Sequence, residues 1–216
     1  MKALKCFLML VSFMGLMLVG CSDQSQSPVS PNDQVSLEKK TIHYFTCTNT
    51  PVPPPYPYAL DPGVKQYLPN GDIHYKKVGV WEYTVTKDLD GNIDPLGTSL
   101  MENYLSSKMN GNTGNGPSHG NLITYRAPGQ EYLGIWEIQY TGYRSYMGKQ
   151  IFNLPIGTGE YHFWQLPLKM VGHGKGGVVD KMKLEVETTL TTFSDDAHFP
   201  EPIFWLGSGS GFYTDD

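Results

Sequence analysis

Two neighbouring stretches between Gly157 and Leu190 constrain the fold most strongly, because they read as two long β-strands joined by a glycine-rich turn. The second stretch alternates apolar and polar residues with a period of two, which is typical of a half-buried antiparallel strand. The apolar set, expected to face the core, comprises Met182, Leu184, Val186, Thr188 and Leu190. The polar set, expected to face water, comprises Lys181, Lys183, Glu185, Glu187 and Thr189. The first stretch is interrupted by Pro167, which predicts a bulge or a sheet edge.

Residues 1–20 have the pattern of a signal peptide, with two lysines before an apolar run that is short for a transmembrane span. The sequence LVGC at residues 18–21 resembles the lipobox of bacterial lipoproteins. This resemblance implies that Cys21 becomes the lipidated first residue of the mature chain and anchors it to a membrane of the bacterial envelope. If the host is Gram-negative, Ser22 after it favours the outer membrane, with the domain facing the periplasm or the cell surface. An ordinary signal peptide that ends near a cysteine is the alternative.

Residues 21–40 are polar and rich in Ser, Gln and Pro, so they bury too little apolar surface to offset the entropy of ordering. We expect them to form a disordered tether. Residues 41–216 are expected to form a single domain that is large enough for a full core.

Charge and cysteine usage exclude some functions. The chain has 16 basic and 21 acidic residues and a net charge of −5, so a nucleic-acid partner is not expected. Lipidation of Cys21 and loss of Cys6 with the signal peptide leave Cys47 as the remaining thiol, which excludes an intramolecular disulfide. Cys47 is expected to be a small buried apolar residue rather than a nucleophile.

Two further strand candidates, residues 79–86 (GVWEYTVT) and 134–141 (GIWEIQYT), resemble each other without gaps. Their aromatic and aliphatic residues fall on one face, so we expect Trp81 and Trp136 to be buried. Glu82 and Glu137 then face water. The alternative is that the glutamate face lines a barrel interior, where carboxylates act as acid and base. The similarity is interpreted as a shared packing demand, with a duplicated hairpin as the alternative.

One helix is expected between Ser99 and Met109. Ser99 and Glu102 have the spacing of a capping box, and Leu100, Met101, Tyr104 and Leu105 share a helical face. Such a short helix would cover an opening or an edge of the sheet.

No nucleophile motif, zinc-ligand spacing or cofactor fingerprint is present, so neither a metal nor a cofactor is expected. The acidic run from Asp88 to Asp94 is interpreted as a hairpin turn rather than a calcium loop, since its glycine is displaced from the position an EF-hand requires. The polar residues Asp195, Asp196 and His198 are interpreted as a turn rather than a metal site. The glycine-rich run at 172–177 is interpreted as a hairpin turn rather than an anion site.

The glycine-punctuated strands, especially GTGEY at 157–161 and the run from 172 to 187, resemble allene oxide cyclase-type small barrels and, more loosely, the lipocalin-like calycins. The resemblance covers about residues 78–192 and implies an antiparallel β-barrel with a central cavity for an apolar or amphipathic small molecule. The fold expected is therefore all-β, an antiparallel barrel with one short helix, and a β-sandwich is the alternative.

The leading functional hypothesis is an envelope lipoprotein whose barrel binds a small apolar or amphipathic ligand or a protein partner. The alternatives are a barrel enzyme acting on a lipid or polyketide-like substrate and a carbohydrate-binding surface module. A ligand pocket is expected at one end of the barrel, lined by aromatic residues and a few polar groups. The predicted ligand-binding residues are Trp164, His162, Glu137 and Tyr140.

Overall fold

The computed structural model describes residues 40–52, 59–125, 131–196 and 203–215. The predicted signal peptide, the tether and Cys21 lie outside the described residues, and so do the proline-rich run at 53–58 and His198. None of the described residues forms an α-helix, and none of their helical segments is long and apolar enough to cross a membrane.

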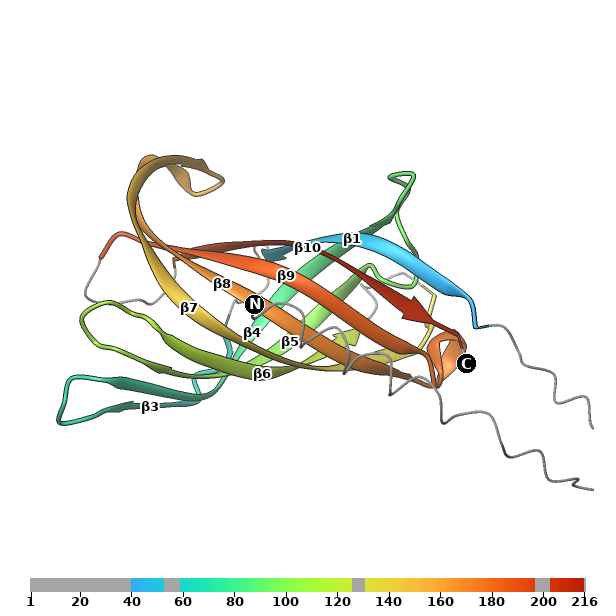
Figure 1. Ribbon diagram of the computed structural model, residues 1–216, viewed down its shortest axis with the longest axis horizontal. Helices are drawn as coiled ribbons and strands as arrows, with labels where there is room; N and C mark the ends of the chain where they lie inside the picture. The colour runs from blue at the N-terminus through green and yellow to red at the C-terminus, as the bar shows by residue number, and fades with distance from the viewer. Residues whose placement is uncertain (1–39, 53–58, 126–130, 197–202, 216) are drawn as a thin grey trace, which may run out of the picture. The chain divides into compact units, whose positions relative to one another are not determined.

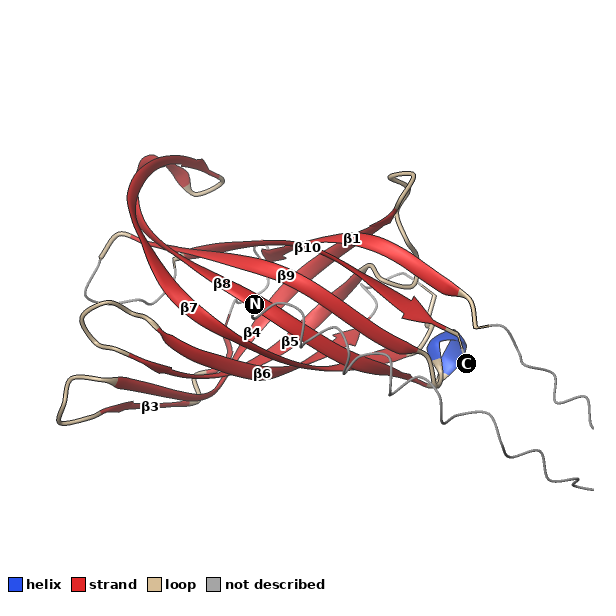
Figure 2. Ribbon diagram, viewed as in Figure 1, coloured by secondary structure: helices blue, strands red, loops and turns tan. Residues whose placement is uncertain are grey.

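The described residues form ten antiparallel strands in one sheet (Figures 1 and 2). The strands are β1 (Ile42–Pro51), β2 (Ala59–Asp61), β3 (Val64–Tyr67), β4 (Ile73–Asp88), β5 (Ser99–Met109), β6 (Gly116–Tyr125), β7 (Ile135–Leu154), β8 (Gly157–Lys175), β9 (Lys183–Ser194) and β10 (Phe204–Thr214). Their order is β1-β10-β9-β8-β7-β6-β5-β4-β2, β3 also pairs with β4, and β1 pairs back onto β4. Eight strands, all except β2 and β3, therefore close a ring of hydrogen bonds that is barrel-like but not regular. The all-β, antiparallel prediction is confirmed.

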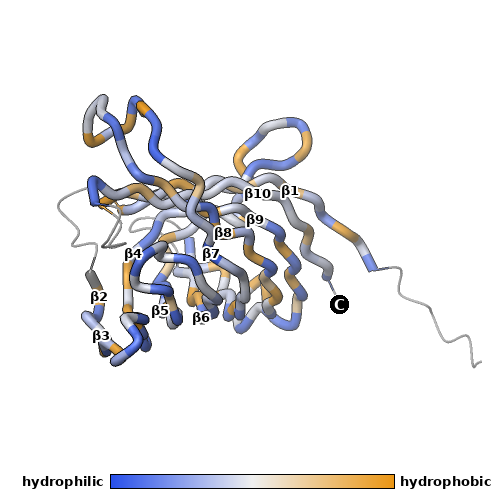
Figure 3. Tube along the Cα trace, turned by 60° about the vertical axis from the view of Figure 1, so that its left-hand side comes forward, coloured by the Kyte–Doolittle hydropathy of each residue, from blue (hydrophilic) through white to orange (hydrophobic). Residues whose placement is uncertain are grey.

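The central strand pair is confirmed. Strands β8 and β9 pair from His162–Ser194 to His173–Lys183, and the short 3-10 turn η1 (Gly177–Val179) lies in the connection between them. Leu184 and Val186 are each 7% exposed, whereas Glu185 and Glu187 face water. Figure 3 shows apolar and polar positions alternating along the strands, as half-buried strands require.

The helix predicted at Ser99–Met109 is wrong, because this segment is strand β5. Burial along it alternates with a period of two: Ser99, Met101 and Asn103 face the interior, while Glu102 and Tyr104 face the other side. Strand β5 pairs along its length with β4 and β6. A capping box contributes only about 1 kcal/mol, so two ladders of backbone hydrogen bonds outweigh the local preference.

The predicted face of residues 79–86 is also wrong. Glu82, Thr84 and Thr86 are buried, whereas Trp81 is only half-buried. In residues 134–141 the prediction is confirmed, since Trp136 is 5% exposed and Glu137 lies on the outer side. The two similar segments therefore present opposite faces to the interior, and the similarity does not reflect equivalent structural positions.

A β-bulge explains this reversal. Between Tyr75 and Val78 strand β4 carries one residue more than β5 opposite it, and Lys77 adopts a φ of 53°. Because side chains alternate with a period of two, one extra residue moves every later side chain to the other face. The bulge thus turns Glu82 inward and Trp81 outward.

Two apolar clusters hold the fold together. The larger fills the ring and includes Phe45, Met101, Trp136 and Tyr213. The smaller involves the ends of β7 and β8, which extend beyond the ring and bend back (Figure 1). There Phe152 packs edge-on against Phe193, with ring centroids 4.9 Å apart, and Leu154, Phe163 and Phe204 complete the cluster. We call residues 148–161 the β7–β8 arm.

Candidate functional site

The four predicted ligand-binding residues lie in three separate places. Tyr140 is 3% exposed and points into the ring. Glu137 is on the outer side of the same strand. Trp164 and His162 lie near the end of the ring from which the β7–β8 arm extends. The residues therefore do not converge on one pocket, and Tyr140 alone lies beside the interior site described below.

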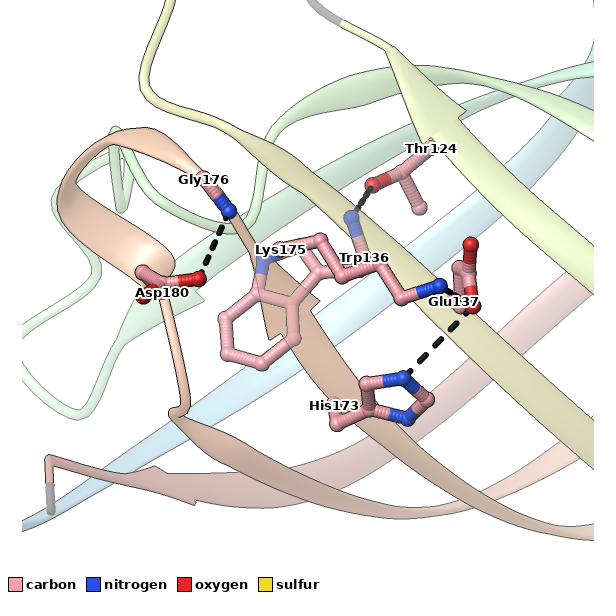
Figure 4. A network of polar contacts seen from close by, with 7 residues as sticks. All are labelled: Thr124, Trp136, Glu137, His173, Lys175, Gly176 and Asp180. Carbon is pink, nitrogen blue, oxygen red and sulfur yellow. Dashed lines mark hydrogen bonds and ion pairs between the residues drawn. The ribbon is translucent and has the colours of Figure 1, made fainter.

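Glu137 belongs to an ion-pair network on the outer side, at the opposite end of β8 from the arm (Figure 4). Its carboxylate lies 2.7 Å from Lys175 Nζ and 3.5 Å from His173 Nε2. The side chains of Glu137 and Lys175 are 37% and 53% exposed, so this pair adds little stability. The network links β7 to the last residues of β8.

Trp164 closes one end of the ring. It is fully buried, and its indole N–H donates to the carbonyl oxygen of Thr113, 2.7 Å away, in the β5–β6 connection. The guanidinium carbon of Arg144 lies 4.7 Å from the Trp164 ring centroid, and the ring of Tyr146 lies 5.2 Å from it. Burial lowers the pKa of Arg144 to about 10, and Tyr75 partly opposes this. We call Trp164, Arg144 and Tyr146 the Trp164 plug.

His162 borders this plug. Its Nδ1 lies 2.6 Å from the hydroxyl of Tyr146, and the two rings stack. The aromatic residues expected to line an open pocket at this end are therefore packed against each other.

A buried polar cluster lies deeper in the ring, formed by Glu82, Asn103, Tyr140 and Asn49. Asn103 Nδ2 donates to Glu82 Oε1 at 2.8 Å, and the Tyr140 hydroxyl donates to Asn103 Oδ1 at 2.6 Å. Glu82 also hydrogen-bonds with the Asn49 side chain. Strands β1, β4, β5 and β7 each supply one of these residues.

Burial sets the protonation of this cluster. Desolvation raises the pKa of Glu82, while hydrogen bonds from Asn103 and Asn49 partly oppose it. Burial also raises the pKa of the Tyr140 hydroxyl, and the nearby Glu82 adds to this shift. Both shifts favour the neutral forms of the two groups.

A cavity of about 50 Å³ adjoins the polar cluster inside the ring. Its walls are mainly apolar and include Leu122, Trp136 and two flexible methionines, Met101 and Met170. A second space of about 10 Å³ lies against Glu82, Asn103 and Tyr140, and Asn49 lines both spaces. Ligand pockets are commonly about 300–1,000 Å³, so the closed interior accepts only a very small molecule.

Cys47 also lines the larger cavity and is 7% exposed, so its predicted burial is confirmed. Burial raises the pKa of its thiol to about 11, although the backbone of Gly209 opposes this shift. A thiol with such a pKa is a poor nucleophile at neutral pH.

The turn after β4 has the hydrogen bonds of a hairpin turn, as predicted. Asp88 Oδ1 accepts from the backbone N–H groups of Asp90 and Asn92, and Gly91 has a φ of 85°. No cluster of three or more potential metal ligands occurs among the described histidines, cysteines, aspartates and glutamates.

Sequence reasoning identified Tyr140 but placed Glu82 on the wrong face and overlooked Asn49 and Asn103. The alternation within residues 79–86 is equally compatible with either face. The bulge at Lys77 decides which of the two faces is buried, and no glycine, proline or other typical turn residue at that position predicts the bulge. The paired-carboxylate alternative did anticipate an inward glutamate, and Glu82 takes that position whereas Glu137 does not.

No protein-family model matches the chain. No curated protein matches it, and no solved structure matches it. The resemblance to small β-barrel families therefore stays an inference from the chain itself.

Proposed function

We propose that the interior of the ring binds a small apolar or amphipathic molecule, in a domain of calycin or allene oxide cyclase-like type. The observation that supports this most is the apolar cavity beside a buried polar cluster. Apolar walls with a few oriented polar groups are the usual composition of a small-molecule site. Lipid on Cys21, which lies outside the described residues, would hold this domain at the envelope membrane.

The cavity of about 50 Å³ is too small for a larger ligand unless side chains in its wall move. Met101 and Met170 line the cavity, and methionine side chains repack more readily than branched ones. A ligand larger than the closed cavity would therefore enter by displacing these two side chains. A closed end at the Trp164 plug directs such entry toward the opposite end of the ring.

Xenon binding tests the proposal. Pressurised xenon should shift the methyl resonances of Met101 and Met170 saturably in the full chain, because an apolar cavity favours an apolar atom. Cys47→Leu enlarges the side chain in the cavity wall by two non-hydrogen atoms and should abolish the xenon-induced shifts. Thr48→Leu, on the outward side of the same strand, is the control and should keep it. Unperturbed methionine resonances in the parent protein would contradict interior binding.

An enzymatic function is the first alternative, and the raised pKa of Glu82 supports it. A buried carboxyl group beside Tyr140 suits general acid–base chemistry on a lipid or polyketide-like substrate. Turnover of such a substrate should be lost in Glu82→Gln while binding is retained. Equal turnover by both proteins would exclude Glu82 from the reaction.

A carbohydrate-binding surface is the second alternative. Tyr44 and Tyr143 are each 55% exposed, and each borders an open depression on the outer wall. The two depressions share Lys169, Glu187 and Ser210. Exposed tyrosines provide stacking faces for sugar rings. Glycan binding that is lost in Tyr44→Ala and Tyr143→Ala would support this alternative over interior binding.

A further inference from the structure

Two polar atoms in the cavity wall lack a hydrogen-bond partner among the residues that the structure describes. Asn49 and Ser99 are 7% and 5% exposed, and both line the 50 Å³ cavity. Asn49 Oδ1 and Ser99 Oγ make no hydrogen bond to any described part of the chain. Buried polar atoms almost always have a partner, so a molecule in the cavity is the natural candidate.

The two atoms occupy one wall of the cavity. Asn49 pairs with Thr84 across β1 and β4, and Thr84 pairs with Ser99 across β4 and β5. The three side chains therefore form one inward-facing row. The Thr84 hydroxyl already donates to Met101 Sδ at 3.0 Å. This leaves Asn49 and Ser99, on either side of Thr84, as the groups available to a ligand.

The chemistry of the row selects the ligand. Asn49 Oδ1 is an acceptor, so its partner must donate, while the Ser99 hydroxyl both donates and accepts. Among the described residues, those that line this cavity include no lysine, arginine, histidine, aspartate or glutamate. A carboxylate would therefore be buried without a cation, close to Glu82. An ammonium group would lose its hydration against apolar walls.

We infer that the interior site takes a small neutral molecule with a hydroxyl group at one end and a short apolar body. Asn49 and Ser99 hold the hydroxyl group, and Leu122, Met101 and Met170 surround the body. A cavity of 50 Å³ has room for about four water-sized groups, which corresponds to a three-carbon alcohol. This inference rests on the proposed interior binding and specifies the class of its ligand.

Titration with matched small probes tests it. The full chain, labelled at the methionine methyl groups, is titrated with 1-propanol and with ethyl methyl ether, which has the same number of non-hydrogen atoms but no donor. Propylammonium and propionate provide the two charged counterparts, and xenon reports on the cavity itself. We expect saturable shifts of Met101 and Met170 with 1-propanol, at least about fivefold weaker binding of the ether, and no saturable shift with either ion.

Ser99→Ala provides the decisive variant. It removes an atom that has no hydrogen-bond partner in the described part of the chain, so the variant should fold and melt as the parent does. Asn49 also contacts Glu82, so its replacement risks misfolding. Ser99→Ala should weaken 1-propanol binding about fivefold and leave xenon binding unchanged. Thr48→Val, which removes an outward hydroxyl from β1, should change neither 1-propanol binding nor xenon binding.

The outcomes separate the inference from the proposed function. Three results would overturn the hydroxyl assignment alone, provided that xenon still binds. These are equal affinities for the alcohol and the ether, an unchanged alcohol affinity in Ser99→Ala, and preferred binding of either ion. Absence of any response to xenon and 1-propanol would overturn the inference and the interior-binding proposal together. In that case the two polar atoms bind resident water only.

Discussion

Glu82 holds a carboxyl group inside the ring, where burial raises its pKa above the value of about 4.3 that it has in an unfolded chain. The folded protein therefore binds a proton that the unfolded protein has already released at intermediate pH. The stability that this group contributes is fully present below about pH 4.3 and is lost as the pH rises through the folded-state pKa.

Glu82→Gln should remove this pH dependence, because glutamine is neutral and keeps an acceptor for Asn103. The free energy of unfolding of the parent should fall relative to that of Glu82→Gln as the pH rises from 4 to 8. Urea denaturation at several pH values measures the difference. Glu185→Gln, on the outer side of β9, is the control and should not change the slope. Parallel curves for the parent and Glu82→Gln would show that Glu82 titrates normally.

Trp136 and Trp81 form a matched pair for the two faces. Trp136 is buried and its indole N–H donates to the carbonyl oxygen of Leu96 at 3.1 Å, whereas Trp81 is half-buried on the outer side of β4. Trp136→Ala should cost about 3–5 kcal/mol, and Trp81→Ala clearly less. Chemical denaturation measures both losses. A larger loss from Trp81→Ala would contradict the assignment of faces in β4.

At the scale of elements, the bulge at Lys77 decides which residues of β4 face the interior. Lys77 has a φ of 53°, a conformation that costs an L-residue about 1–2 kcal/mol, and its N–H donates to Ser106 Oγ at 3.1 Å. Lys77→Gly should therefore raise the free energy of unfolding by about 1 kcal/mol. Lys76→Gly, at the neighbouring position with ordinary φ, should lower it. Destabilisation by both substitutions would argue against a left-handed conformation at Lys77.

The β7–β8 arm is held by a small apolar cluster outside the main core. Phe152 contacts Phe163 and Phe193 edge-on, with ring centroids 5.1 and 4.9 Å away, whereas the adjacent Ile151 is 76% exposed. Phe152→Ala should allow the arm to unfold locally. The free energy of opening measured by hydrogen exchange should fall by about 1–3 kcal/mol in the arm and stay unchanged in the ring.

Ile151→Ala is the control for the arm and should leave its exchange unchanged. Loss of protection throughout the ring in Phe152→Ala would mean that the arm and the ring unfold as one unit.

At the scale of the whole molecule, the ring starts at Ile42, so no described contact depends on Cys21. If Cys21 carries the proposed lipid anchor, Cys21→Ser should release the protein from membranes while its melting temperature stays the same. Fractionation with a carbonate wash and thermal denaturation measure the two properties. Cys6→Ser should leave anchoring intact. Membrane retention of Cys21→Ser after the wash would refute the lipobox assignment.

The sequence by itself determined the all-β class and the central strand pair, because a period-two pattern such as Leu184–Val186–Thr188 records a face that is buried on one side only. It also determined the inward face of residues 134–141. These are local properties, because each can be predicted from the alternation of apolar and polar residues along one segment.

Only the tertiary structure decided the rest. Residues 99–109 carry helix signals that pairing with β4 and β6 overrides, and Glu82 faces inward because a single extra residue at Lys77 shifts the alternation of β4. The candidate site follows from both decisions, since Asn49, Glu82, Asn103 and Tyr140 come from four strands that meet only when the ring closes. Contacts between distant strands have no local pattern, and a one-residue shift in register is enough to exchange the core face of a strand for its wet face.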